Sequence, residues 1–317
     1  MASTLPSNGR LVNIGTHSLA LYTHGPEPSS ASDPVVLFIS GVASDALNWQ
    51  AVVRLLGPTV RSYTYDRSGY NNSESSPRAP TAENVALELS LLIEKAPIAN
   101  PLILVGHSWA GVLTHEYIAL KGADQLAGLV LVDANHETAP LVMDVNDPIL
   151  WTVIAAGVEP YSAWGVESGH KLTQEEWDAF RAAESTDQFK LTERQEEIEN
   201  YLPSFEILRK KELSKRQPLL GGKPVYVIGG TRSRDWSGLY AAGVAKGNGN
   251  EEERSHVREM IKTVDAKNEG LMNEFRKLST KSELVFATES GHFVQLTQPD
   301  IVVDGVKWAL NNLPVSA

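Results

Sequence analysis

Five short apolar runs recur along the chain, and residues that favour turns bound each of them. They are rich in Val, Ile and Leu, and they read PVVLFISG (34–41), PLILVGH (101–107), LAGLVLVDA (126–134), KPVYVIGG (223–230) and SELVFATES (282–290). Runs of this length and composition are typical of strands buried on both faces, as in a parallel sheet. Buried helical segments can look similar over so few residues, but the flanking Pro and Gly favour strands.

Helical patterns separate these apolar runs. Residues 81–96 offer Thr81 as a cap and apolar residues at helical spacing, 110–122 continue the pattern, and 300–313 follow Pro299. An alternation of strand and helix builds βαβ units. The sequence therefore predicts an α/β fold with a doubly wound, mostly parallel sheet.

Two long excursions interrupt this alternation. Residues 134–222 hold charged, helix-like stretches with no convincing strand, and residues 231–281 form a second excursion. Insertions at the carboxyl ends of parallel strands lie where open α/β sheets bind ligands. We therefore expect a core made of residues 1–133 and 223–317, with residues 134–222 as a helical cap.

Composition excludes several classes of function. The chain of 317 residues contains no cysteine, which rules out disulfides, thiolate metal sites and a cysteine nucleophile. Its formal net charge of −11 argues against nucleic-acid or anionic-membrane partners, because those need clustered Lys and Arg. The sequence shows no metal-ligand spacing such as H-E-x-x-H. We expect no metal and no cofactor.

The first fifteen residues lack a basic region followed by a long apolar region, so we expect no secretory signal. No apolar run approaches the 18 residues that a membrane-spanning helix requires. A glycosylation sequon at Asn71 carries no meaning without a signal. We expect a cytoplasmic protein.

The segment VGHSWAG (105–111) places Ser108 between two glycines, directly after an apolar run. The pattern G-x-S-x-G is weak alone, but a strand–turn–helix corner there would expose the hydroxyl above the sheet. Such a corner strains the serine backbone by about 1–3 kcal/mol. The start of the following helix points N–H groups at the same spot, which favours a developing negative charge.

GHSWAG matches the nucleophile elbow of the α/β-hydrolases, and the chain resembles the serine esterases and lipases of that superfamily. Residues 38–49 are similar to the oxyanion loop, although Ser40 replaces the usual His. Residues 65–73 resemble the D-x-x-G-x-G-x-S stretch. Residues 126–137 resemble the sixth strand of the family, and 289–302 resemble its catalytic-histidine loop. The resemblance implies a Ser–His–acid triad.

A serine hydroxyl needs a base within hydrogen-bond reach. His292 is the predicted base, because it follows a strand-like run, adjoins Gly291 and comes last in the order Ser…acid…His. The other histidines are expected to pack or to lie on the surface; they are His17, His24, His107, His115, His136, His170 and His256.

The acid of the triad is open between two positions. In the commoner family arrangement it follows the seventh strand, three residues after a glycine, and counting from Gly230 gives Ser233, which cannot serve. Asp235 lies two residues further on. Asp133 ends the sixth strand, a position that some members use, and Glu137 is a more distant candidate. We favour Asp133, with Asp235 as the alternative acid.

By the same resemblance, the backbone N–H groups of Val42 and Trp109 form the oxyanion hole. Ser40 either adds a hydrogen bond there or braces the loop, and we expect bracing. The side chain of Trp109 either walls the substrate pocket or packs under the cap. Pocket candidates are Ser40, Trp151, Tyr161, Trp164 and Trp236, with Trp177, Phe180 and Tyr240 as further aromatic residues of the region.

The predicted function is a serine hydrolase acting on a carboxylic ester or lactone of a hydrophobic small molecule, which aromatic walls suit. Acyl transfer or C–C bond hydrolysis with the same triad is one alternative. A non-hydrolytic ligand-binding protein is another, since a fold does not fix a function. Haloalkane dehalogenase and epoxide hydrolase chemistry is disfavoured, because those relatives carry Asp where this chain has Ser108.

Overall fold

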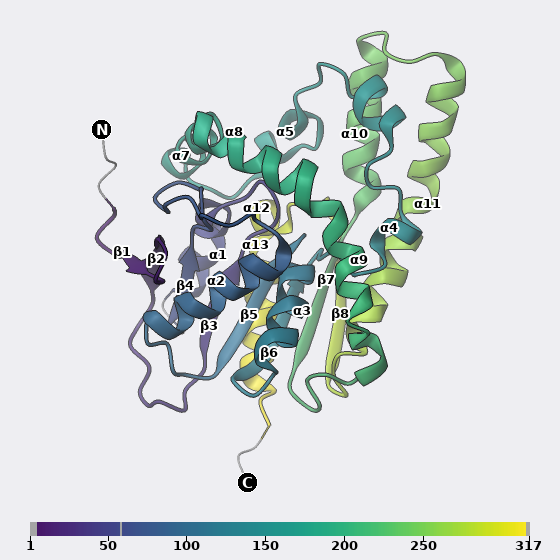
Figure 1. Ribbon diagram of the computed structural model, residues 1–317. Coiled ribbons are helices and arrows are strands. Elements are labelled where there is room, and N and C mark those ends of the chain that lie inside the picture. The colour runs from purple at the N-terminus through teal and green to yellow at the C-terminus, as the bar shows by residue number, and fades with distance from the viewer. Residues whose placement is uncertain (1–4, 58, 315–317) are drawn as a thin grey trace.

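The computed structural model describes residues 5–57 and 59–314, so the first four residues of the segment examined for a secretory signal lie outside it (Figure 1). One eight-stranded sheet has the order β1-β2-β4-β3-β5-β6-β7-β8. β1–β2 and β2–β4 are antiparallel, whereas all pairs from β4 to β8 are parallel. The predicted mostly parallel α/β sheet is confirmed. The strands are β1 (Gly9–Asn13), β2 (Ser18–His24), β3 (Val35–Ile39), β4 (Ser62–Tyr65), β5 (Leu102–His107), β6 (Leu126–Val132), β7 (Val225–Gly230) and β8 (Ser282–Ala287).

Helices cover both faces of the sheet, and the central strands β3, β5, β6 and β7 each contribute to two separate cores. In β3, Val35, Leu37 and Ile39 belong to one core, while Val36 and Phe38 belong to the other. This follows from the two-residue period of a strand. One face carries α1 (Gln50–Leu56), α12 (Val294–Thr297) and α13 (Pro299–Asn311); the other carries α2 (Ala82–Lys95), α3 (Ala110–Lys121), α9 (Leu202–Lys210) and part of α11 (Glu251–Arg276).

Between β6 and β7 the described residues form helices and no strand, and Figure 1 shows α7 and α8 running across the top of the sheet. Thr173 begins α7 with a capping box, and Thr186 caps α8. Val166, Leu172 and Phe180 pack with Ala51 and Leu296 of the sheet domain, which anchors this insert. Its elements are α4 (Ala139–Val142), η2 (Ile149–Ile154), α5 (Pro160–Ala163), α6 (Val166–Gly169), α7 (Gln174–Glu184), α8 (Asp187–Arg194), η3 (Gln195–Tyr201), α9 and η4 (Leu213–Arg216).

The second excursion is a pair of helices, α10 (Arg232–Ala245) and α11, which rises beside the insert (Figure 1). Asn250 begins α11 with a capping box that includes Glu253. The short 3-10 helix η1 (Ala46–Trp49) precedes α1 on the opposite side of the sheet. Among the helices of residues 5–57 and 59–314, none combines the length and the apolar character that crossing a bilayer demands.

Candidate active site

Ser108 lies in the turn between β5 and α3, at the carboxyl end of the sheet. Its φ of +57° is a left-handed conformation, which costs a residue other than glycine about 1–3 kcal/mol. A Cβ on Gly106 would lie 3.0 Å from the Ala110 Cβ, and one on Gly111 would lie 2.4 Å from the Asn135 carbonyl oxygen. The turn therefore needs glycine at position 111, and a side chain at position 106 would be in tight contact with Ala110.

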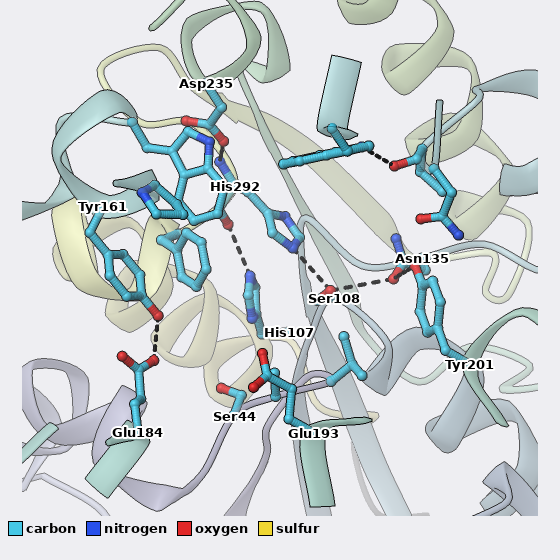
Figure 2. A pocket seen from close by; sticks show the side chains of 18 of the residues that line it. Ser44, His107, Ser108, Asn135, Tyr161, Glu184, Glu193, Tyr201, Asp235 and His292 are labelled. Carbon is cyan, nitrogen blue, oxygen red and sulfur yellow. Dashed lines mark hydrogen bonds between the residues drawn. The ribbon is translucent and has the colours of Figure 1, made fainter. Parts of the chain in front are cut away.

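His292 lies in the loop after β8, and its ring reaches Ser108 (Figure 2). Its Nε2 is 2.9 Å from Ser108 Oγ, and its Nδ1 is 2.7 Å from Asp133 Oδ2. The His107 ring donates from Nε2 to the His292 carbonyl oxygen at 2.9 Å, which holds the backbone of this loop. Ser108, His292 and Asp133, which are far apart in the sequence, thus form one hydrogen-bonded chain.

Asp133 directly follows β6, and its side chain is fully buried. It accepts hydrogen bonds from the Gly230 amide at 3.0 Å and from the Asn268 side chain at 2.9 Å. Arg232 Nε lies 2.7 Å away as an ion pair, although its N–H is not aligned for a hydrogen bond. Burial favours a higher pKa for Asp133, but Arg232, His292 and Asn268 outweigh it and hold this pKa well below the ordinary value.

Asp235, the alternative acid, projects from α10 toward the backbone of His292 rather than its ring (Figure 2). Its Oδ2 accepts the His292 backbone N–H at 2.7 Å. Burial raises the pKa of Asp235 to about 7, against the opposing effects of that hydrogen bond and of Arg232. Glu137 lies beside Arg209 instead. Of the three candidate acids, the structure brings Asp133 to the imidazole.

The imidazole of His292 lies in surroundings that favour its neutral form. Burial and the Arg232 charge lower its pKa, and the contact with Asp133 opposes this shift. Since a lower pKa keeps the ring neutral to more acidic pH, His292 is a free base over a wider pH range than an ordinary histidine. A neutral base and an ionised acid are the charge states that activation of a serine requires.

The backbone N–H groups of Val42 and Trp109 are the predicted donors of an oxyanion hole. Neither donates a hydrogen bond to any atom of the described residues. A Cβ on Gly41 would lie 2.8 Å from the Ser108 Cβ, so this glycine allows the Val42 loop to come close to the serine. Both amides therefore remain available to donate to a ligand atom, which a role in an oxyanion hole requires.

Two predictions about pocket walls are resolved by hydrogen bonds. Ser40 does not line the cavity, which corrects its place among the pocket residues. Its hydroxyl donates to the Asp45 carbonyl at 2.7 Å and accepts from the Trp49 indole at 3.0 Å, so it braces the loop. The fully buried Trp109 side chain donates to Ser204 Oγ at 3.0 Å, and it packs instead of walling the pocket.

A cavity of about 840 Å³ includes Ser108 and His292 in its wall. This volume lies in the usual range for small-molecule sites. Four predicted aromatic residues line it, namely Trp151, Tyr161, Trp164 and Trp236, whereas Trp177, Phe180 and Tyr240 do not. Across the described ranges, no group of three or more His, Asp or Glu side chains is placed to hold a metal ion.

Four polar residues around Ser108 and Asp133 were missed by sequence reasoning. Asn135 Oδ1 lies 3.3 Å from Ser108 Oγ and accepts from the Tyr201 hydroxyl at 3.1 Å (Figure 2). Asn135 follows Asp133 by two residues, so its position after the sixth strand was a usable signal. Tyr201, Arg232 and Asn268 belong to no motif, and only the folded chain brings them to the triad.

Two known proteins are similar in sequence to most of this chain. A probable transporter, efuK, of Hormonema carpetanum is 30% identical over 97% of this chain, which spans only 43% of that protein's length. An AB hydrolase superfamily protein of Gibberella zeae is 27% identical over 91% of this chain and 90% of its own.

Solved structures with the same fold include a thermophilic esterase from Thermogutta terrifontis, with a TM-score of 0.60 and 17% identity over 96% of this chain and 98% of its own. A putative epoxide hydrolase from Pseudomonas aeruginosa has a TM-score of 0.64 and 15% identity over 97% of each chain. At these identities the likeness concerns the fold alone. The model of the alpha/beta hydrolase family matches residues 36–305. The chain therefore belongs to the alpha/beta hydrolase family.

Proposed function

We propose that this protein is a serine hydrolase that cleaves a carboxylic ester or lactone of a fairly hydrophobic small molecule. The observation that carries the proposal is the hydrogen-bonded chain from Ser108 through the ring of His292 to Asp133. The aromatic walls of the cavity support an apolar substrate. In this proposal residues 134–222 act as a cap over the site.

In the first half of the reaction, Ser108 Oγ attacks the acyl carbon while His292 Nε2 takes the hydroxyl proton. Asp133 stabilises the imidazolium, and the Val42 and Trp109 amides hold the tetrahedral oxyanion. The bond from the acyl carbon to the leaving oxygen then breaks as His292 returns its proton to that oxygen. The products of this half are an acyl ester on Ser108 and an alcohol, which is released from an ester and stays attached to the acyl chain of a lactone.

In the second half, water replaces the alcohol beside His292. The ring removes one proton from the water as its oxygen attacks the acyl carbon, and the same amides hold the second oxyanion. Collapse breaks the bond to Ser108 Oγ, which takes the proton back from His292. The carboxylic acid leaves, and the original hydroxyl is restored.

A fluorophosphonate probe, combined with a screen of alkyl, aryl and lactone esters, tests the proposal. We expect stoichiometric labelling of Ser108, steady turnover of at least one ester class, and loss of both in Ser108→Ala with its thermal unfolding unchanged. Labelling at another residue, or none in folded protein, would contradict the mechanism. Binding without turnover identifies a ligand-binding protein, and product formed only with an added alcohol or amine identifies acyl transfer.

A further inference from the structure

Among the described residues, the cavity wall contains a buried hydroxyl without a hydrogen-bond partner, that of Ser44. Ser44 lies two residues after Val42, follows the left-handed Ala43 (φ +49°), and is 4% exposed. Its Oγ makes no hydrogen bond with any described residue, although Ser44 lines the cavity. A buried hydroxyl without a partner costs free energy, which a ligand hydrogen bond would recover.

A carboxylate without a hydrogen bond lies on the same side of Ser108. Glu193 comes from α8, lines the cavity, and appears with Ser44 below Ser108 and His107 in Figure 2. It is partly buried, and no hydrogen bond to its side chain occurs among the described residues. Burial raises the pKa of Glu193, and Lys190 partly offsets this. The carboxylate therefore lacks part of its hydration and has open acceptor positions.

A third polar group closes this side of the cavity. The Tyr161 hydroxyl donates to Glu184, and Arg181 reaches the other oxygen of that carboxylate at 3.3 Å. Burial raises the pKa of Glu184 to about 7, and the negative charge of Glu193 adds to this rise. The two carboxyl groups therefore repel each other. Arg181 offsets part of the charge of Glu184 but also pairs with Glu159 at 3.0 Å, and Lys190 offsets part of the charge of Glu193.

We propose that Ser44 and Glu193 form a polar subsite that binds a hydroxyl group on the substrate, with the Tyr161–Glu184 pair as its outer wall. A ligand hydroxyl can donate to Glu193 and accept from Ser44, which an alkyl group cannot do and which an ammonium group does only in part. The inference rests on the proposed function and narrows its substrates to esters or lactones that carry a hydroxyl group away from the reacting carbonyl.

The test compares matched esters that differ only by a hydroxyl in place of a terminal methyl, placed on either the acyl or the alcohol portion. We expect the wild-type protein to favour one hydroxylated ester in kcat/KM by about ten-fold or more, as a hydrogen bond to a charged group allows. In Glu193→Leu and Ser44→Ala this ratio falls toward one. Glu199→Leu, on the exposed face of η3, is the matched control and keeps the wild-type ratio.

A binding measurement separates this inference from the proposed function. Non-hydrolysable ketone isosteres of the two esters are titrated into Ser108→Ala protein, and the hydroxylated ketone is expected to have the lower Kd, with the difference lost on adding Ser44→Ala. Equal Kd values and equal kcat/KM values would overturn the subsite. A trimethylammonium ester preferred over the hydroxyl ester would overturn the choice of a neutral donor. Absence of any turnover with the Kd difference intact would overturn the proposed hydrolysis alone.

Discussion

At the scale of single residues, the buried Asp133 and Asp235 both contact His292, but they contact different parts of it. Asp133 meets the Nδ1 side of the His292 ring at 2.7 Å, whereas Asp235 meets its backbone N–H at the same distance. Arg232 and Asn268 add to the charge stabilisation of Asp133. Asp235 has fewer groups that offset the cost of burying its charge. It can still hold the His292 loop when protonated, because its side chain accepts the backbone N–H of His292 in either state.

This difference predicts unequal effects of the same substitution. Asp133→Asn should lower kcat by about 10⁴, because an amide at this position favours the wrong tautomer of the imidazole. Asp235→Asn should lower kcat by less than about ten-fold, since an amide oxygen still accepts the backbone N–H. Both are measured on the best ester from the screen, with thermal unfolding as the folding control. A larger loss in Asp235→Asn would reverse the assignment of the acid.

Local sequence was enough to single out Ser108 and His292, which the structure brings within hydrogen-bond distance, and four aromatic residues of the cavity, but it left the acid open between two positions. Ser108 and His292 lie in motifs whose glycines and strand context are visible along the chain. The choice between Asp133 and Asp235 depends on which part of His292 each carboxylate faces, and no local pattern encodes that. Ser44 and Glu193 come from a loop and a helix far apart in sequence, so only the folded insert brings them together.

At the scale of elements, the histidine loop fits against β7 and α10 with almost no free space. A Cβ on Gly291 would lie 1.8 Å from Asp235 Oδ1, and one on Gly230 would lie 2.2 Å from the Gly291 carbonyl oxygen. The loop that carries His292 is therefore positioned by backbone contact with two other elements. Its location depends on glycine at positions 230 and 291.

Gly291→Ala should lower kcat/KM by about 10², because a shift of roughly 1 Å in a catalytic group costs that much. The mechanism is displacement of the loop by Asp235, so adding Asp235→Ala should restore part of the loss and give a non-additive double-mutant cycle. Gly270→Ala in α11 is the control, since a Cβ there meets no atom within 4 Å. Additive effects in the double variant would show that the contact does not position the histidine.

The apolar runs correctly predicted β3 and β5 to β8, and Thr81 caps α2 as expected. The strands that sequence analysis missed are β1, β2 and β4, which lie at the antiparallel edge. β1 buries only Val12, and β4 has four residues, so neither presents a continuous apolar run. The helical nature of the two excursions follows from their charged periodic pattern, whereas their path over the sheet depends on packing of the insert against α12 and η1.

At the scale of the whole molecule, the junction between sheet and insert encloses a second recess of about 490 Å³. Alanines of α7 line one side, and Asp66 and Asn71 line the other. Asp45 lies next to them, 1% exposed, and accepts from the Leu47 amide at 2.8 Å and from Asn71 at 2.6 Å. Burial and the charge of Asp66 raise the pKa of Asp45 to about 7.

The raised pKa makes the stability of the molecule depend on pH. In the unfolded chain Asp45 ionises near pH 4, whereas the folded protein keeps its proton up to about pH 7. Its contribution to the free energy of unfolding is therefore largest below pH 4 and is lost as pH rises from about 4 to about 7. Asp45→Asn removes this loss and keeps an N-cap oxygen for η1, since Asn and Asp cap equally well.

Urea unfolding of Asp45→Asn and the wild-type protein at pH 5 and pH 8 measures the effect. We expect the free energy of unfolding of the variant to rise relative to that of the wild type from pH 5 to pH 8. The reason is that only the wild-type chain must ionise the buried Asp45 carboxyl over this range. Asp124→Asn, at an exposed position, is the control and should follow the wild-type pH dependence. If the free energy of unfolding of Asp45→Asn changes with pH as that of the wild type does, the junction does not bury a protonated carboxyl. Asp45 and Asp66 then both carry their charges in the folded protein.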